Sequence, residues 1–248
     1  QRQMCIRDSQ GRWGKNVLHG RKVRLPRGAA PPTDRSAPDN HMSIVFEGIS
    51  HSLWQAETPK NGVLWAAWGG MARLSEIGRN LPNAQGGRGS GLNQIAGLIT
   101  PGDLAAGEIR HALAVAVNAD FVARGHVWPA SRSDGSVPPG PTTVKEGQRL
   151  RLAPDVDLAG IVDEDPKTQV FARMIAKALR DYGAIVVDRG GESLSFYMVN
   201  PTSWTSVGAR NPWPDLAGPT NASGSYNDVI RHTGIPWHRL QVIQEGRS

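Results

Sequence analysis

Residues 107–135, GEIRHALAVAVNADFVARGHVWPASRSDG, contain the most informative pattern of the chain. Within 109–117 every second residue is apolar except His111, and this alternation predicts a strand with one buried face. A polar imidazole on a buried face needs a hydrogen-bond partner or a chemical purpose. The pattern therefore marks His111 as a candidate site residue, with a polar loop at 131–135 following it in sequence.

Working outward, further short runs read as strands because they are apolar or alternating and are bounded by turn residues. The runs around Gly48 and around Gly190 predict hairpins. Few runs are long and continuously apolar, which favours an antiparallel sheet over a parallel one. The additional strands are expected at 43–47, 50–55, 63–68, 126–128, 148–152, 184–188, 193–199 and 239–244.

Two helices are predicted between the strands. Thr100 followed by Pro101 and Asp103 is typical of a capped helix start, and Gly107 is expected to end this short helix. A longer amphipathic helix is expected between Asp165 and Gly183. Its apolar face would comprise Val170, Phe171, Met174, Ile175, Ala178 and Leu179.

Together these elements predict a mainly β (α+β) fold. The expected architecture is an antiparallel β-sandwich or jelly-roll-like body with one amphipathic helix and a short second helix.

The first nine residues, QRQMCIRDS, resemble the translated end of a transposase-type sequencing adapter. We therefore interpret residues 1–27 as an adapter artefact plus a truncated leading segment, and residues 28–248 as a single globular domain. The true start of the protein would then be missing, together with any signal peptide. Cys5 is the one cysteine, so the body offers no disulfide, zinc thiolate or cysteine nucleophile.

The charge balance divides at the same point. The whole chain carries a formal +6 and residues 1–27 carry +7, so the remainder sums to −1. The basic character belongs to the leading segment, and a nucleic-acid partner is not expected. No apolar run approaches the roughly 18 residues that a membrane span needs, so a membrane partner is not expected either.

Known cofactor and catalytic motifs are missing from the sequence. The glycine-rich run at 83–91 is not followed by the lysine-serine or lysine-threonine pair of a phosphate-binding loop, and no G-x-S-x-G elbow occurs. The histidines show neither H-x-H nor H-E-x-x-H spacing, so a metal site would have to be assembled from distant strands. We therefore predict no cofactor and no metal.

Four segments carry a family resemblance: GLITPGDLAAGEIRHALAVAV, HVWPASRSDG, EGQRLRLAPDVDL and ARMIAKALRDYGAIVVDRGG. They resemble a family of largely uncharacterised bacterial proteins with G-E-I-x-H-A-L, V-W-P-A and Y-G-x-I-V motifs. The resemblance covers about residue 39 to residue 244 and implies that the full-length parent is secreted. Arg110 and Gln55 depart from the family, because acidic residues are usual at both positions.

The candidate site combines histidine, arginine, an acid and aromatic rings, as carbohydrate-processing clefts do. Histidine can move a proton near neutral pH, and arginine can neutralise a uronate carboxylate. Structural alternatives remain open for each residue, including a core role for His111 and a turn role for the loop residues. The predicted catalytic residues are His111, His126, Arg132 and Asp134, and the predicted substrate-binding residues are Trp128, Trp54 and His51.

These residues lead to two alternative functions. The first is a secreted carbohydrate-active protein that cleaves a polysaccharide by β-elimination or hydrolysis. The second is a non-catalytic extracellular binding or structural module. A polysaccharide or another small polar ligand is the expected partner, and the sequence leaves the oligomeric state open.

Overall fold

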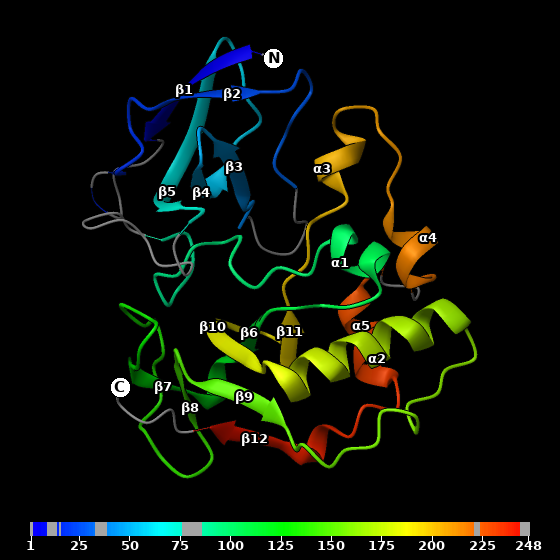
Figure 1. Cartoon of the computed structure of the whole chain (residues 1–248). Helices are drawn as coiled ribbons and strands as arrows, with labels where there is room; N and C mark the ends of the chain where they lie inside the picture. Colours follow the sequence, from blue (N-terminus) through cyan, green and yellow to red (C-terminus); the bar gives the residue numbers. More distant parts are fainter. Residues whose placement is uncertain are drawn as a thin grey trace. The chain divides into compact units, whose positions relative to one another are not determined.

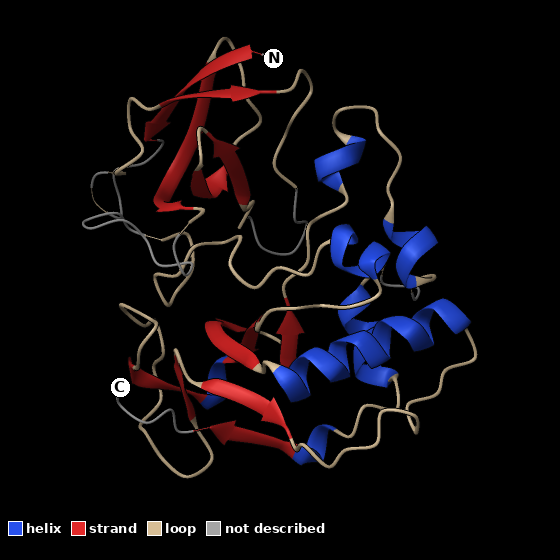
Figure 2. Cartoon of the chain, viewed as in Figure 1, coloured by secondary structure: helices blue, strands red, loops and turns tan. Residues whose placement is uncertain are grey.

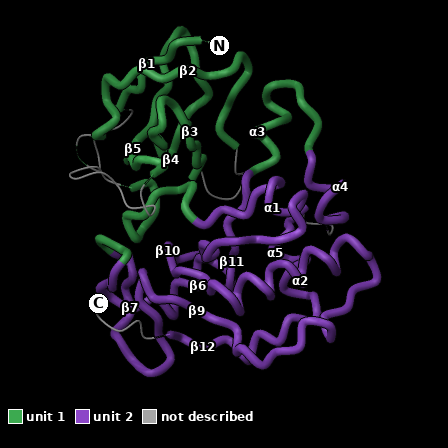
Figure 3. The backbone as a smooth tube through the Cα atoms, in the orientation of Figure 1, with its two compact units in different colours: residues 1–96, 129–132, 200–211 green, residues 97–128, 133–199, 212–248 purple. Residues whose placement is uncertain are grey.

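The computed structural model describes residues 2–8, 14, 16–32, 39–75, 86–220 and 224–243 (Figure 1). By its internal contacts the chain divides into two compact units (Figure 3). Unit 1 comprises residues 1–96, 129–132 and 200–211, and unit 2 comprises 97–128, 133–199 and 212–248. This division describes packing, and the single domain expected over 28–248 stays a prediction. The fold is mainly β, as predicted (Figure 2).

Unit 1 contains one five-stranded sheet in the order β2-β1-β5-β4-β3. Strand β1 runs parallel to β5, and the other neighbours are antiparallel. Met4 and Ile6 of β1 are buried in the core, so the segment interpreted as adapter-derived forms part of the sheet. The bounds are β1 Arg2–Asp8, β2 Lys22–Leu25, β3 Met42–Phe46, β4 Ile49–Ala56 and β5 Val63–Arg73, and the unit also holds α3, Thr202–Thr205.

The β3–β4 hairpin predicted around Gly48 is confirmed. Its two turn residues, Glu47 and Gly48, have φ values of 50° and 72°. Positive φ at both central positions is the backbone twist that a two-residue hairpin turn requires. The sequence therefore specified both the turn and its strands, which pair antiparallel from Phe46↔Ile49 onward.

Unit 2 contains a second five-stranded sheet, in the order β11-β6-β10-β9-β12, and the separate pair β7-β8. The central strand β6 is buried along Leu113–Val117 on both faces, which explains its continuous apolar run. The bounds are β6 Leu113–Asn118, β7 Val122–His126, β8 Val144–Glu146, β9 Arg149–Leu152, β10 Ala184–Gly190, β11 Leu194–Phe196 and β12 Leu240–Ile243.

Three sequence expectations about these strands are corrected. The pairs β1–β5, β6–β10 and β7–β8 are parallel, so the sheets are mixed rather than antiparallel. Strands β10 and β11 do not form a hairpin, because β6 lies between them. Strand β6 begins at Leu113, so His111 precedes the strand and does not lie on its buried face. A jelly-roll arrangement stays a prediction.

The two predicted helices are confirmed. In α1 (Pro101–Ala106), Thr100 and Asp103 form a capping box, and Gly107 ends the helix in the left-handed conformation. In α2 (Pro166–Asp181), the Asp165 side chain accepts a hydrogen bond from the Thr168 amide. Among the described residues, no helix is long and apolar enough to cross a membrane.

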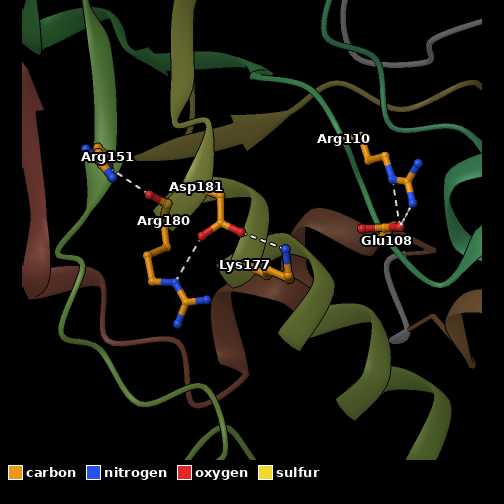
Figure 4. Close-up of polar contacts among 6 residues, drawn as sticks. All are labelled: Glu108, Arg110, Arg151, Lys177, Arg180 and Asp181. Carbon is orange, nitrogen blue, oxygen red and sulfur yellow. Dashed lines mark hydrogen bonds and ion pairs between the residues drawn. The ribbon is translucent and has the colours of Figure 1, made fainter.

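Side chains form hydrogen bonds and ion pairs at the C-terminal end of α2 (Figure 4). Arg151 of β9 donates from Nε to the carbonyl oxygen of Arg180 at 2.7 Å, which supplies one of the carbonyls that a helix end leaves unpaired. Asp181 bonds both Lys177 and Arg180. The last turn of α2 is thereby tied to the sheet.

Unit 2 also contains short helices that the sequence did not reveal. These are α4 (Trp213–Ala217), α5 (Tyr226–His232) and the single turns η1 (Ala119–Phe121) and η2 (Trp237–Arg239), and α4 and α5 pack against α2. The Tyr226 ring lies 6.1 Å from the Phe171 ring and 5.9 Å from the Trp213 ring, centroid to centroid. Aromatic contacts of this kind anchor helices that are too short to be stable alone.

The buried face of α2 can be tested by truncation. Ile175 is 0% exposed, whereas Val170, predicted on the same face, is 51% exposed. We expect Ile175→Ala to lower the free energy of unfolding by about 2–5 kcal/mol, because it leaves a cavity. Val170→Ala, the matched control, should change it by less than about 0.5 kcal/mol. Urea denaturation of both variants checks this, and equal losses would contradict the assigned face.

Candidate functional site

Three predicted site residues belong to unit 1 and make structural contacts there: His51, Trp54 and Arg132. His51 is buried, with Nδ1 3.3 Å from the Ile44 carbonyl oxygen, and burial lowers its pKa. Trp54 donates from Nε1 to Asp39 Oδ1 at 3.0 Å. Their predicted substrate-binding roles stay predictions.

Arg132 is the third of these residues. Its Nη2 atom donates to the carbonyl oxygens of Gly86 and Arg88 at 3.1 and 2.7 Å. Its guanidinium carbon lies 5.6 Å from the centre of the Trp68 ring, which is a cation–π distance. These contacts hold the loop that begins at Gly86, and the catalytic role of Arg132 stays a prediction.

His111 lies in unit 2, between α1 and β6. Its Nδ1 atom is 3.0 Å from the carbonyl oxygen of Ala112, and its Nε2 atom is 3.6 Å from Asp103 Oδ2. That carboxylate oxygen already accepts hydrogen bonds from the amide and the hydroxyl of Thr100 in the capping box. The acid beside His111 therefore serves first to start helix α1.

Arg110, at a position where the resemblance predicts an acid, is a surface residue. It pairs with Glu108 through Nε and Nη2, and the Nε distance is 2.7 Å (Figure 4). The pair is exposed, so it contributes little to stability.

His126 and Trp128 lie at the end of β7. His126 is exposed and is the register partner of Glu146 on β8. Trp128 has 57% of its surface exposed, an unusual placement for so large an apolar ring. The amide of the intervening Val127 donates to the Glu146 carbonyl oxygen at 2.9 Å, so this segment runs beside Glu146.

Among the predicted residues, Asp134 is the one that the structure places with other carboxyl groups. Asp134, Glu146 and Asp188 each offer an oxygen, and these oxygens all lie within 4.8 Å of one another. We refer to these three residues as the acid cluster. All three belong to unit 2.

The loop that holds Asp134 lies directly on strand β7. Gly135 has no room for a side chain, because a Cβ there would collide with the carbonyl oxygen of Ala123. The amide of Ser136 donates to the Val122 carbonyl oxygen at 3.1 Å. This close approach needs glycine for steric reasons and fixes the position of Asp134.

Glu146 and Asp188 are brought together by the connection between β8 and β10. Gly147, with φ of 92°, donates from its amide to the Val186 carbonyl oxygen at 2.8 Å. The register of β10 against β6 shifts between Val186 and Asp188, which marks a β-bulge. Bulges redirect side chains and are frequent beside functional sites.

Donors orient each carboxyl group of the cluster. The amide of Asp134 donates to Glu146 Oε2 at 3.1 Å, and the Ser133 side chain also bonds the Glu146 carboxyl group. The pairs Arg189 Nε–Asp134 Oδ2, at 3.2 Å, and Tyr197 OH–Asp188 Oδ2, at 3.3 Å, complete the arrangement. The three side chains are therefore held in place rather than solvated individually.

Glu146 is the unusual member of the cluster. It is 0% exposed, and its Oε1 atom has no hydrogen-bond partner among the described residues. Burial raises the pKa of Glu146 to about 8, and the nearby negative charges of Asp134 and Asp188 add to this effect, while the bond from Ser133 opposes it. Glu146 therefore holds a proton at neutral pH when nothing else neutralises it.

The sequence missed both residues because Glu146 ends β8, a three-residue strand that was not predicted, and Asp188 lies within the ordinary strand β10. The one available signal was glycine: Glu146 precedes Gly147, and Asp134 precedes Gly135. Such dipeptides are common in turns and do not by themselves indicate a site.

Compared with protein-family models, curated proteins and solved structures, the chain matches none. The chemistry of the acid cluster therefore rests on its own residues.

The protonated state of Glu146 makes stability depend on pH. Between pH 4.5 and about 8 the folded chain keeps a proton that the unfolded chain has released, so the free energy of unfolding falls as pH rises. Glu146→Gln removes this titration. We expect the variant to match the wild type near about pH 4 and to exceed its stability by roughly 2–4 kcal/mol near about pH 8.

Urea denaturation across this pH range measures the effect. Glu164→Gln is the matched control, because Glu164 is exposed in a loop of the same unit. The control should follow the wild-type curve, and an unchanged pH slope in Glu146→Gln would contradict the assignment.

Proposed function

We propose that this chain is a carbohydrate-active protein that cleaves glycosidic bonds at the acid cluster. The observation that supports this most directly is a buried carboxyl group, Glu146, beside two more accessible ones, Asp134 and Asp188. Hydrolysis of a glycosidic bond needs one carboxyl group that donates a proton and a second that acts as a nucleophile or base. Carboxyl groups in such different environments divide these roles between them.

The roles follow from the contacts. Burial keeps the proton on Glu146, so Glu146 is the proton source of the site, and the half-buried Asp188 beside it passes that proton to the leaving oxygen. Asp134, which is ion-paired with Arg189 and exposed, is the ionised partner. Tyr197, whose hydroxyl group donates to Asp188 Oδ2, offers that group to a sugar oxygen as well.

Between the two reactions considered, the charge of the cluster favours hydrolysis of a neutral glycan. β-Elimination requires a positive group to neutralise the uronate carboxylate of the substrate. Arg189 is already paired with Asp134, and the cluster places three carboxyl groups around it. An acidic sugar would be repelled there unless further positive charge were bound.

The alternative function, a non-catalytic extracellular binding module, is favoured by the aromatic residues near β7. Trp128 and Phe121 are both exposed and belong to the same unit as the cluster. Aromatic faces of this kind stack on sugar rings without any chemistry. Export of the full-length parent, which the family resemblance implies, is part of both proposals.

The reaction is tested with the full chain on neutral and acidic polysaccharides. Release of reducing ends measures hydrolysis, and ultraviolet absorbance of unsaturated uronides measures elimination. We expect reducing ends from a neutral glycan, and a loss of about 100-fold or more in kcat for Glu146→Gln, because the proton donor is removed. Glu164→Gln should keep the wild-type rate.

Equal rates for Glu146→Gln and the wild type would exclude the acid cluster as the catalytic site. Retention on a polysaccharide gel without any product, abolished by Trp128→Ala, would establish the binding module instead.

A further inference from the structure

We propose that the acid cluster is a binding site for a divalent cation of the Ca²⁺ class. This inference goes beyond the proposed function: it uses the same three carboxyl groups but does not depend on any reaction. Two observations support the site: the geometry of the oxygens and the buried oxygen of Glu146.

The spacing of the oxygens fits a calcium ion. One oxygen from each of Asp134, Glu146 and Asp188 lies within 4.8 Å of the other two. Ca²⁺ binds oxygen at about 2.3–2.6 Å, so ligands on opposite sides of the ion are up to about 5 Å apart. Mg²⁺, with bonds of about 2.1 Å, demands a stricter octahedron. Three oxygens within the 4.8 Å limit can all be ligands of one Ca²⁺ ion.

The ligand chemistry points to the same class of ion. The three groups are all carboxyls, which hard cations prefer over the imidazole and thiolate ligands of zinc or copper. Three carboxylates would balance the charge of the ion together with that of Arg189. Three protein ligands also leave positions for water or for the oxygens of a bound sugar.

The buried oxygen is the independent observation. Glu146 Oε1 is sealed from solvent and has no hydrogen-bond partner among the described residues, although its carboxyl group reaches the two aspartates. An unsatisfied buried oxygen costs free energy, and a charged one costs more. A cation held between the three residues would neutralise the buried carboxyl group to which this oxygen belongs.

The surrounding donors support a metal site as well. Metal-binding carboxylates are commonly oriented by hydrogen bonds from outside the ligand set. Here the amide of Asp134 orients Glu146, the hydroxyl of Tyr197 orients Asp188, and Arg189 holds Asp134. The ligands are thus positioned before any ion arrives, which lowers the entropic cost of binding.

A bound cation would also change the chemistry proposed above. It would occupy the position of the Glu146 proton, so hydrolysis by that proton would stop. It would supply the positive charge that an acidic sugar needs at this site. Cation binding and hydrolysis therefore exclude each other at Glu146, and the two proposals can fail separately.

Calorimetric titration of the full chain tests the cation site without any activity readout. The protein is first dialysed against EDTA and then against metal-free buffer, and CaCl₂, MgCl₂ and MnCl₂ are titrated separately. We expect one saturable site for Ca²⁺, with Kd of about 10⁻⁶–10⁻³ M, and weaker binding of Mg²⁺. Ca²⁺ should also raise Tm.

Variants locate the site. Glu146→Gln and Asp188→Asn should each weaken Ca²⁺ binding by about tenfold or more, because each removes a charged ligand. Asp120→Asn is the matched control, since Asp120 is an exposed acid of the same unit and should leave Kd unchanged. Glu146→Gln is expected to fold at least as well as the wild type, so its loss of binding cannot come from unfolding.

The inference is overturned if none of the three ions gives a saturable signal with the wild type. It is equally overturned if Glu146→Gln and Asp188→Asn bind Ca²⁺ as tightly as Asp120→Asn does.

Discussion

The parallel pairing of β6 with β10 is the constraint on which the site-bearing unit depends. Its register runs from Ala184↔Leu113 to Gly190↔Asn118. Parallel neighbours cannot be joined by a tight turn, so the chain between them has to form a long crossover. That crossover contains β7, β8, β9 and α2. Asp134 and Glu146 come from its loops and strands, and Asp188 comes from β10 itself, so one pairing brings all three acids to the same place.

Local chemistry explains what the sequence could predict. The capping box at Thr100 and Asp103, the start of α2 at Asp165 and the turn at Gly48 are all decided within a few residues. Interactions over such short separations leave a readable pattern, because the same residues form the signal and the structure. These elements were predicted correctly for that reason.

Strand neighbours, by contrast, depend on residues far apart in the chain. Residues 184–188 and 193–199 were expected to form a hairpin because a glycine pair separates them. Strand β6, about 70 positions earlier in the sequence, pairs with both and lies between them. A continuous apolar run such as Leu113–Val117 favours an inner strand that is buried on both faces, but from the sequence it was interpreted as an alternating strand with one buried face.

The candidate site shows the same contrast between features set by nearby residues and features set by distant ones. The reasoning that a polar group on an apolar strand needs a partner was sound, but it was applied to His111, which lies outside β6. The group that meets the description is Glu146, buried at the end of β8 with one oxygen unsatisfied among the described residues. Sequence could not identify it, because its burial comes from the crossover packing onto β10.

The cost of that buried carboxyl group links the two proposals. A negative charge enclosed near two other carboxylates destabilises the folded chain, so the group has to be neutralised in some way. A proton and a divalent cation are the two means that the surrounding residues allow. With a proton bound, Glu146 is a proton donor suited to hydrolysis. With a cation bound, the cluster is a positive centre suited to acidic ligands. Under the two proposals, the occupant of the cluster would decide both the charge of the ligand that unit 2 accepts and the chemistry open to it.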